Sequence, residues 1–253
     1  MIALSVNLNK IALIRNSRDT TNPSVRDHAQ MCIDAGADGI TVHPRPDQRH
    51  IRAQDCFDLM KMLSGEFNIE GNPFSGPRKS EREGVSDYPG FMELVRQIRP
   101  AQCTLVPDTD GQLTSDHGFD LTRDGERVAP LIAELKSLGI RTSLFMDPDP
   151  EQIRLAAQTG TDRIELYTES YADAFKSGQN MEAVFASFIT AAQIAAEEGL
   201  ELNAGHDLDL NNLPRFATVP GLLEVSIGHA LTVDAIRMGL ANAVAAYQKA
   251  LGK

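Results

Sequence analysis

The chain of 253 residues carries 24 Lys and Arg against 35 Asp and Glu, which gives a formal net charge of −11 at pH 7, and 42% of its residues are hydrophobic. This acidic balance excludes the basic surface that nucleic-acid binding requires, and no apolar run approaches the roughly 20 residues that span a bilayer. The three cysteines show no Cys-x-x-Cys spacing, so we expect buried free thiols in the reducing cytoplasm.

A repeat of apolar strand, polar connection and amphipathic helix runs along the whole chain. Residues 1–7 lack the basic segment of a signal peptide and are interpreted as the first strand. Eight strands are predicted in all, at residues 2–7, 39–43, 67–70, 102–106, 141–146, 163–167, 201–204 and 223–227. Long helices are predicted over residues 181–198 and 231–251.

Strand–helix alternation of this kind indicates a parallel α/β sheet, and eight units favour closure. We therefore predict a (β/α)8 TIM barrel with extra helices, formed by a single domain over residues 1–253. A doubly wound open sheet is the alternative, although the glycine-rich dinucleotide turn typical of that fold does not follow the first strand.

Two connections are longer and more polar than the others. Residues 71–90 form a loop insertion rich in glycine, proline and charge after the third strand, and residues 107–126 follow the fourth. Long loops inside domains are typically lids or disordered insertions. Both follow the carboxyl ends of strands, where barrel enzymes place their sites.

Three residues able to transfer protons end three of the predicted strands, namely His43, Glu70 and His206. Histidine titrates near neutrality and burial raises the pKa of glutamate, so this set can move protons in both directions at pH 7. A structural hydrogen-bonding role for His43 and a buried ion pair of Glu70 with an arginine are the alternatives. Other residues at the carboxyl ends of strands, which converge on one mouth in a barrel, are Asn7, Asn9, Lys10, Arg45, Asp147, Glu165, Tyr167, Gly228 and His229.

The sequence offers two places for anionic groups. The pairs Gly205-His206 and Gly228-His229 follow the last two strands, where backbone N–H groups and a helix N-terminus commonly bind phosphate in barrels. The segment 45–50 supplies arginines whose planar groups match phosphate oxygens. No HExxH motif or Cys/His cluster is present, so no metal site is expected.

A set of short motifs, spread over nearly the whole chain, resembles one known enzyme family. The motifs occupy residues 6–12, 15–18, 35–45, 47–51, 67–70, 105–107, 202–206 and 227–230. Among them are Ile40-Thr41-Val42-His43-Pro44-Arg45 and Asn203-Ala204-Gly205-His206. In this joint pattern the chain resembles the pyridoxine 5′-phosphate synthase family.

The resemblance implies a β/α barrel that works without a cofactor in a homo-oligomer, an octamer built from dimers. The reaction would condense 3-amino-2-oxopropyl phosphate with 1-deoxy-D-xylulose 5-phosphate, giving pyridoxine 5′-phosphate, phosphate and water. His43 and Glu70 would be the proton acceptors and His206 the proton donor. The residues that would bind the amino ketone phosphate are Asn7, Arg18, Gly228 and His229. Those that would bind the pentulose phosphate are Arg45, His50 and Thr114.

The chain departs from the family pattern near the second substrate. Asn9 and Lys10 stand where the family has Asp-His, and Asp207 stands where it has glycine, so all three are placed among the substrate-binding residues. Two other functions stay open at this point. One is a barrel enzyme that forms a Schiff base between Lys10 and a different phosphorylated ketose. The other is a non-catalytic binder of phosphorylated metabolites, which would have little use for the acid–base residues.

Overall fold

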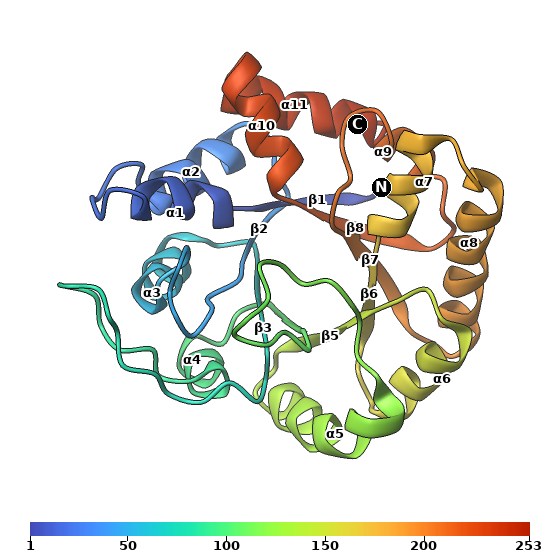
Figure 1. The fold of residues 1–253 in the computed structure, drawn as a ribbon, viewed down its shortest axis with the longest axis horizontal. Coiled ribbons are helices and arrows are strands. Elements are labelled where there is room, and N and C mark those ends of the chain that lie inside the picture. Colours follow the sequence, from blue (N-terminus) through green and yellow to red (C-terminus); the bar gives the residue numbers. More distant parts are fainter.

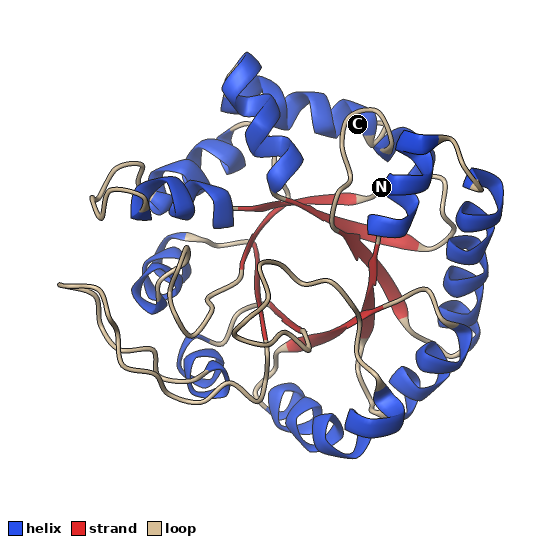
Figure 2. Ribbon diagram, viewed as in Figure 1, coloured by secondary structure: helices blue, strands red, loops and turns tan.

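The computed structural model describes residues 1–253, and its centre is a closed sheet of eight parallel strands in sequence order, with β1 paired to β8 (Figure 1). Helices surround this sheet on its outer side (Figure 2). The strands are β1 Ala3–Asn7, β2 Gly39–Val42, β3 Glu66–Gly71, β4 Gln102–Leu105, β5 Arg141–Met146, β6 Arg163–Tyr167, β7 Glu201–Gly205 and β8 Leu222–Ile227. The helices are α1 Asn9–Asn16, α2 Val25–Asp34, α3 Ala53–Met62, α4 Phe91–Ile98, α5 Leu121–Ser137, α6 Pro150–Gln158, α7 Glu169–Ser177, α8 Met181–Glu197, α9 Leu213–Phe216, α10 His229–Met238 and α11 Leu240–Ala250.

The predicted TIM barrel is confirmed, and the open sheet is excluded because the strands close on themselves. The single helix predicted over residues 231–251 is wrong. Gly239 takes a φ of 84°, in the left-handed region, and this ends α10 and starts α11. The predicted loop over residues 107–126 is too long, because Asp120 accepts a hydrogen bond from the backbone of Thr122 and α5 begins at Leu121.

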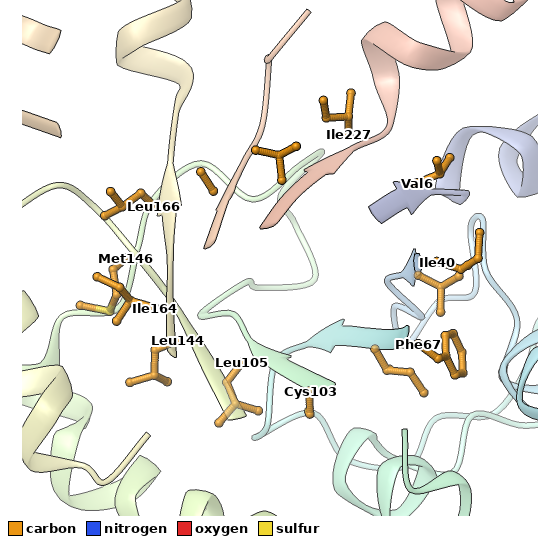
Figure 3. Packing of buried hydrophobic residues seen from close by; sticks show 14 of the residues in the cluster. Val6, Ile40, Phe67, Cys103, Leu105, Leu144, Met146, Ile164, Leu166 and Ile227 are labelled. Carbon is orange, nitrogen blue, oxygen red and sulfur yellow. The ribbon is translucent and has the colours of Figure 1, made fainter. Parts of the chain in front are cut away.

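Successive residues of each strand meet two different environments, as a pleated strand requires. One set is apolar and belongs to a cluster of 57 buried residues between the sheet and its helices. Figure 3 shows part of it, with Leu144, Met146, Ile164 and Leu166 close together on β5 and β6. The hydrophobic core therefore lies outside the barrel.

The alternate residues fill the barrel interior and are largely polar. Ser5 and Thr41 share a hydrogen bond of 2.6 Å between their hydroxyls, and the hydroxyl of Thr104 donates to the side-chain oxygen of Asn68 at 3.2 Å. Large branched apolar residues dominate the interior of most TIM barrels. Here hydrogen bonds between neighbouring strands replace that packing, and polar groups reach from the base of the barrel to its mouth.

The two long connections differ in where they run. Residues 72–90 (teal in Figure 1) extend outward past α3 and α4, and the paired backbones of Arg78 and Tyr88 hold them as a bridge. The segment between β4 and α5 crosses the mouth of the barrel. Only this second segment borders the large cavity at the mouth, through Leu113, Thr114 and Ser115. The 71–90 insertion does not border it.

Candidate active site

A cavity of about 310 Å³ opens at the carboxyl ends of the strands. Of the predicted site residues it is lined by Asn7, Asn9, Lys10, His43, Arg45, His50, Glu70, Thr114, His206, Asp207, Gly228 and His229. Arg18 is the exception, because it is exposed in the turn after α1 and does not reach the cavity. Residues far apart in the sequence thus meet where strand-end reasoning placed them.

His43 is buried and faces a carboxyl group through each of its ring nitrogens. Its Nδ1 lies 3.9 Å from Oε2 of Glu70, and its Nε2 lies 3.6 Å from Oδ2 of Asp108. The backbone N–H of His43 donates to Oδ1 of Asn9 at 2.9 Å. The imidazole therefore sits in a fixed position between two acids.

Glu70 reaches the mouth from the end of β3 without an arginine partner. The side-chain amide of Asn7 donates to its Oε2 at 3.4 Å, His43 lies 3.9 Å away, and the hydroxyl of Ser226 is also within hydrogen-bonding reach. The alternative of a buried ion pair between Glu70 and an arginine is therefore wrong. A carboxyl group buried without a counter-charge favours its protonated form.

His206 begins the segment after β7 in a conformation that non-glycine residues rarely adopt. Its φ is 82° and that of Asp207 is 55°. The hydroxyl of Thr168 donates to the backbone carbonyls of Gly205 and His206, and Asn212 donates to that of Asp207 at 2.9 Å. Such backbone strain is of order 1–3 kcal/mol and persists where the surroundings hold it. The imidazole packs against Phe145 and Tyr167, with ring centroids 5.5 and 5.2 Å away.

The connection after β1, where the chain departs from the family pattern, is the first turn of α1. The backbone N–H of Asn9 donates to the side-chain oxygen of Asn7 at 3.0 Å. The side-chain oxygen of Asn9 in turn accepts the hydrogen bond from the backbone N–H of His43. Lys10 lines the cavity and forms no ion pair or hydrogen bond with the protein. Asn9 thus supports the site, and Lys10 leaves a cation free to meet an anionic ligand.

Arg45, predicted to bind a phosphate, is already engaged by protein groups. Its guanidinium forms an ion pair with Asp108 and donates to the backbone carbonyl of Gln112 at 2.9 Å. Because these contacts occupy both terminal nitrogens, its main role in this structure is to hold the segment that crosses the mouth.

Two glycines bring the backbone close to the site. A Cβ on Gly205 would lie 2.4 Å from Oε1 of Glu165, and one on Gly228 would lie 3.1 Å from Cβ of Asn7. These small residues leave room for the interior carboxyl group and for a ligand at the start of α10.

Burial sets the protonation states of the acid–base residues. Desolvation holds the pKa of His43 well below its usual value, and the charge of Arg45 adds to the effect. The pKa values of His50 and His206 are also lowered, chiefly by burial. Burial raises the pKa of Glu70 well above the ordinary range, with the nearby Glu165 and Asp108 adding to it. Burial therefore favours neutral imidazoles and the protonated form of Glu70.

Burial also raises the pKa of Glu165, to about 8. Glu165 was noted from sequence only as a strand-end residue and not placed in the site, yet it lines the cavity. Sequence reasoning missed several other lining residues, which are Thr104, Val106, Leu113, Ser115, Phe145, Leu208, Ser226, Ile227 and Ala230. Thr104, Phe145 and Ser226 share the alternation of the polar interior, which is the signal that could have found them. Asp147, also noted at a strand end, bonds instead to the backbone of Gly118 at 3.1 Å.

A closed β/α barrel that places the imidazoles of His43 and His206 and the carboxyl group of Glu70 at its mouth is a TIM-barrel enzyme built for acid–base chemistry. No three His, Cys, Asp or Glu side chains are arranged to hold a metal ion. No helix is long and apolar enough to cross a membrane.

The chain belongs to the family described as pyridoxal phosphate biosynthesis protein PdxJ, whose model matches residues 4–253. It is 56% identical over 248 residues to a pyridoxine 5′-phosphate synthase of Xanthomonas campestris, covering 96% of this chain and 94% of that one. It is 51% identical over 248 residues to the enzyme of the same name from Xylella fastidiosa, covering 96% and 92%. The predicted family and the predicted synthase function are thereby confirmed.

Solved structures of lower similarity share the fold alone. The 3-hexulose-6-phosphate synthase of Salmonella typhimurium superposes with a TM-score of 0.59 at 15% identity, covering 99% of this chain and 98% of that one. The tryptophan synthase A-subunit of Pyrococcus furiosus gives 0.59 at 12% identity, covering 100% and 98%.

Proposed function

We propose that this cavity condenses 3-amino-2-oxopropyl phosphate with 1-deoxy-D-xylulose 5-phosphate, and that His43, Glu70 and His206 move the protons. The observation that carries the proposal is the juxtaposition of His43 Nδ1 and Glu70 Oε2, 3.9 Å apart on neighbouring strand ends. His43 Nδ1 has no hydrogen-bond partner in the protein and Glu70 pairs with no cation other than His43, so both groups are available to the reactants.

The reaction needs this set of groups. Closing a pyridine ring from an amino ketone and a pentulose requires imine formation, dehydrations and loss of phosphate. Each step removes a proton from one atom and delivers another to a leaving oxygen. Each positioned acid or base contributes about 10²- to 10⁴-fold to such a step.

The protonation states suggest an order for these transfers. The lowered pKa values of His43 and His206 favour neutral imidazoles that start as acceptors, and the raised pKa of Glu70 favours a protonated carboxyl group that starts as a donor. Once Glu70 has delivered its proton to a leaving oxygen, its carboxylate serves as an acceptor for the next step. After His206 has gained a proton, it acts as the donor that the family resemblance implies. The site can therefore alternate between its two states within one turnover.

The two phosphate groups would bind at different parts of the rim. Backbone N–H groups at the start of α10, after Gly228, provide one anion site, with His229 beside it. Lys10 and Thr114 face the cavity from the other segments and would meet the second phosphate. Arg45 would support that site through Gln112 rather than by direct contact.

The test supplies both substrates to the purified protein and measures pyridoxine 5′-phosphate by mass spectrometry together with phosphate release. Product from the natural sequence and a loss of about 10²-fold or more in Glu70→Gln are expected. A matched control is Glu66→Gln, four residues earlier on β3 at the opposite end of the barrel. No product at any protein concentration would refute the proposal.

A homo-oligomer in the cytoplasm completes the proposal. Large apolar side chains are exposed on three neighbouring helices, with Leu13 and Ile14 on α1, Met31 on α2 and Ile236 on α10. Contacts between copies would cover them, and light scattering measures the resulting mass. Three buried free cysteines are consistent with a reducing compartment.

A further inference from the structure

Asp108 lies directly behind His43, on the segment that follows β4, and its side chain is 5% exposed. We propose that Asp108 is a positioning residue that fixes the tautomer of His43, so that Nε2 carries the proton and Nδ1 faces Glu70 as the acceptor. This inference rests on the proposed role of His43 in the reaction.

The contacts of Asp108 orient its carboxylate toward the imidazole. Oδ2 accepts a hydrogen bond from the hydroxyl of Ser115 at 2.9 Å, forms the ion pair with Arg45, and lies 3.6 Å from His43 Nε2. Its backbone carbonyl accepts from the side-chain amide of Asn72 at 2.6 Å. A carboxylate held from several sides is acceptor-only, so the imidazole nitrogen that faces it is favoured as N–H.

The opposite side of the ring has the complementary chemistry. Oε2 of Glu70 lies 3.9 Å from Nδ1, and burial raises the pKa of this carboxyl group, which favours the protonated form that can donate to Nδ1. An anion at Nε2 and a neutral acid at Nδ1 select the same tautomer. His43 Nδ1 is thus left as the basic nitrogen next to the reacting groups.

Asp108 is not explained by packing alone. Its second oxygen, Oδ1, is buried without a protein hydrogen-bond partner, as is the hydroxyl of Tyr88. Both residues line a small cavity of about 10 Å³, close to the volume that one water molecule occupies. Replacing a buried ion pair by apolar residues is often neutral or stabilising, so stability alone gives little reason for an acid here.

The charged groups around His43 determine how its pKa should change when Asp108 is replaced. The charged and titratable groups that face it are Glu70 on β3, Asp108 after β4, Arg45 and Arg49 after β2, His50 in the same segment and His206 after β7. Removing the Asp108 charge leaves Arg45 without its partner, which lowers the pKa of His43 further. Activity that needs neutral His43 is lost as pH falls through this pKa, so the acid limb of the kcat/KM profile moves to lower pH.

The first experiment is nitrogen-15 NMR of the natural protein with labelled histidine, with His43 assigned by the signal missing in His43→Gln. We expect His43 to be neutral at pH 7 with the proton on Nε2. A proton on Nδ1 would overturn the proposal. This readout needs no substrate, so it decides the tautomer whether or not the proposed reaction is observed.

The second experiment measures kinetics of Asp108→Asn and Asp108→Glu. We expect the asparagine variant to lower kcat by about 10- to 100-fold with KM changed less than about threefold, to shift the acid limb to lower pH, and to be partly rescued by glutamate. The control is Asp110→Asn, whose side chain is 66% exposed and pairs with Arg78 away from His43. An unchanged kcat and acid limb in Asp108→Asn, with an active natural protein, would refute the positioning role.

Circular dichroism checks the fold of each variant. Should Asp108→Asn fail to fold, Ser115→Ala removes one donor to Oδ2 while keeping the acid. In that variant we expect the acid limb to move in the opposite direction, to higher pH, because the carboxylate becomes more available to His43. An acid limb that stays in place would count against the proposal.

Discussion

Glutamates occupy both ends of the barrel interior, but those at the amino end pair with arginines, whereas Glu70 and Glu165 at the mouth do not. There Arg163 donates to Glu201 at 2.6 Å and to Glu224 at 3.2 Å, and Arg141 donates to Glu66 at 2.5 Å. At the mouth, Glu70 has no cationic partner and Glu165 contacts a hydroxyl. At the base, the charges of Arg163 and Arg141 oppose the rise in the pKa of Glu224 that burial causes, whereas at the mouth no arginine pairs with Glu70 or Glu165 and burial raises both pKa values. Glutamates that pair with arginines thus have a structural role, and the glutamates without such a pair are available for chemistry.

The largest test of this comparison removes a proton carrier at the mouth. We expect His206→Asn to lower kcat by about 10²- to 10⁴-fold, with the free energy of unfolding little changed. Asparagine tolerates the left-handed backbone that His206 adopts, so the substitution isolates the chemistry from the strain. His28→Asn, on α2 outside the cavity, is the control for steady-state kinetics. An equal loss of kcat in His206→Asn and His28→Asn would contradict a specific role of His206 in proton transfer.

The converse change breaks a pair at the base. Arg163→Met leaves Glu224, which is buried, without its arginine, and we expect a loss of about 3 kcal/mol in the free energy of unfolding. The kcat of the folded fraction should stay within about twofold, since no reacting group is touched. Urea denaturation measures the first quantity and kinetics the second. Arg96→Met, which breaks an exposed pair with Glu134, should change stability by less than about 1 kcal/mol.

A smaller effect concerns the loss of folding stability caused by burying Glu165 without a cationic partner. The unfolded chain releases the proton of a glutamate near pH 4.3, whereas folded Glu165 keeps its proton up to about pH 8. The folded state binds more protons between these values, so its stability falls as pH rises through this window. Glu165→Gln removes that slope, and we expect Tm to rise by about 3 °C or more at pH 8 and by less near pH 5. Differential scanning calorimetry at several pH values would show a parallel pH dependence in both proteins if this reasoning fails.

The smallest effect concerns Lys10, a cation at the mouth without a partner. We expect Lys10→Met to raise KM for one phosphorylated substrate by about three- to tenfold and to leave kcat within about twofold, because one phosphate contact is lost. Borohydride with the pentulose phosphate should trap no adduct on the natural protein. A trapped adduct on Lys10, with kcat abolished in the variant, would establish the Schiff-base alternative instead.

Much of this arrangement could be predicted because strand ends are visible in the sequence. His43, Glu70 and His206 each follow an apolar run, and parallel closure brings such positions together whatever the intervening residues are. Asp108 could not be selected in this way. It is one of several acids in a polar connection, and only the fold shows that it is buried against His43.

Other features depend on tertiary contacts that the sequence pattern does not reveal. Gly239 sits inside an apolar helical periodicity, where a single glycine is tolerated, and only the structure shows that its φ of 84° separates α10 from α11. Arg45 is bonded to Asp108 and Gln112 because the segment that crosses the mouth brings these two residues next to it. The polar barrel interior was visible in Arg163-Ile164-Glu165 as alternation, but the apolar members alone were used to identify the strand.

The placement of the hydrophobic core outside the barrel bears on how such a molecule can change over time. Each strand contains two alternating sets of residues, one that faces the helices and one that faces the barrel interior. Substitutions in the second set alter polarity, charge and ligand fit while the helix-facing packing remains intact. A protein with this layout can change its ligand fit at the mouth by small steps while the helix-facing residues keep the fold stable.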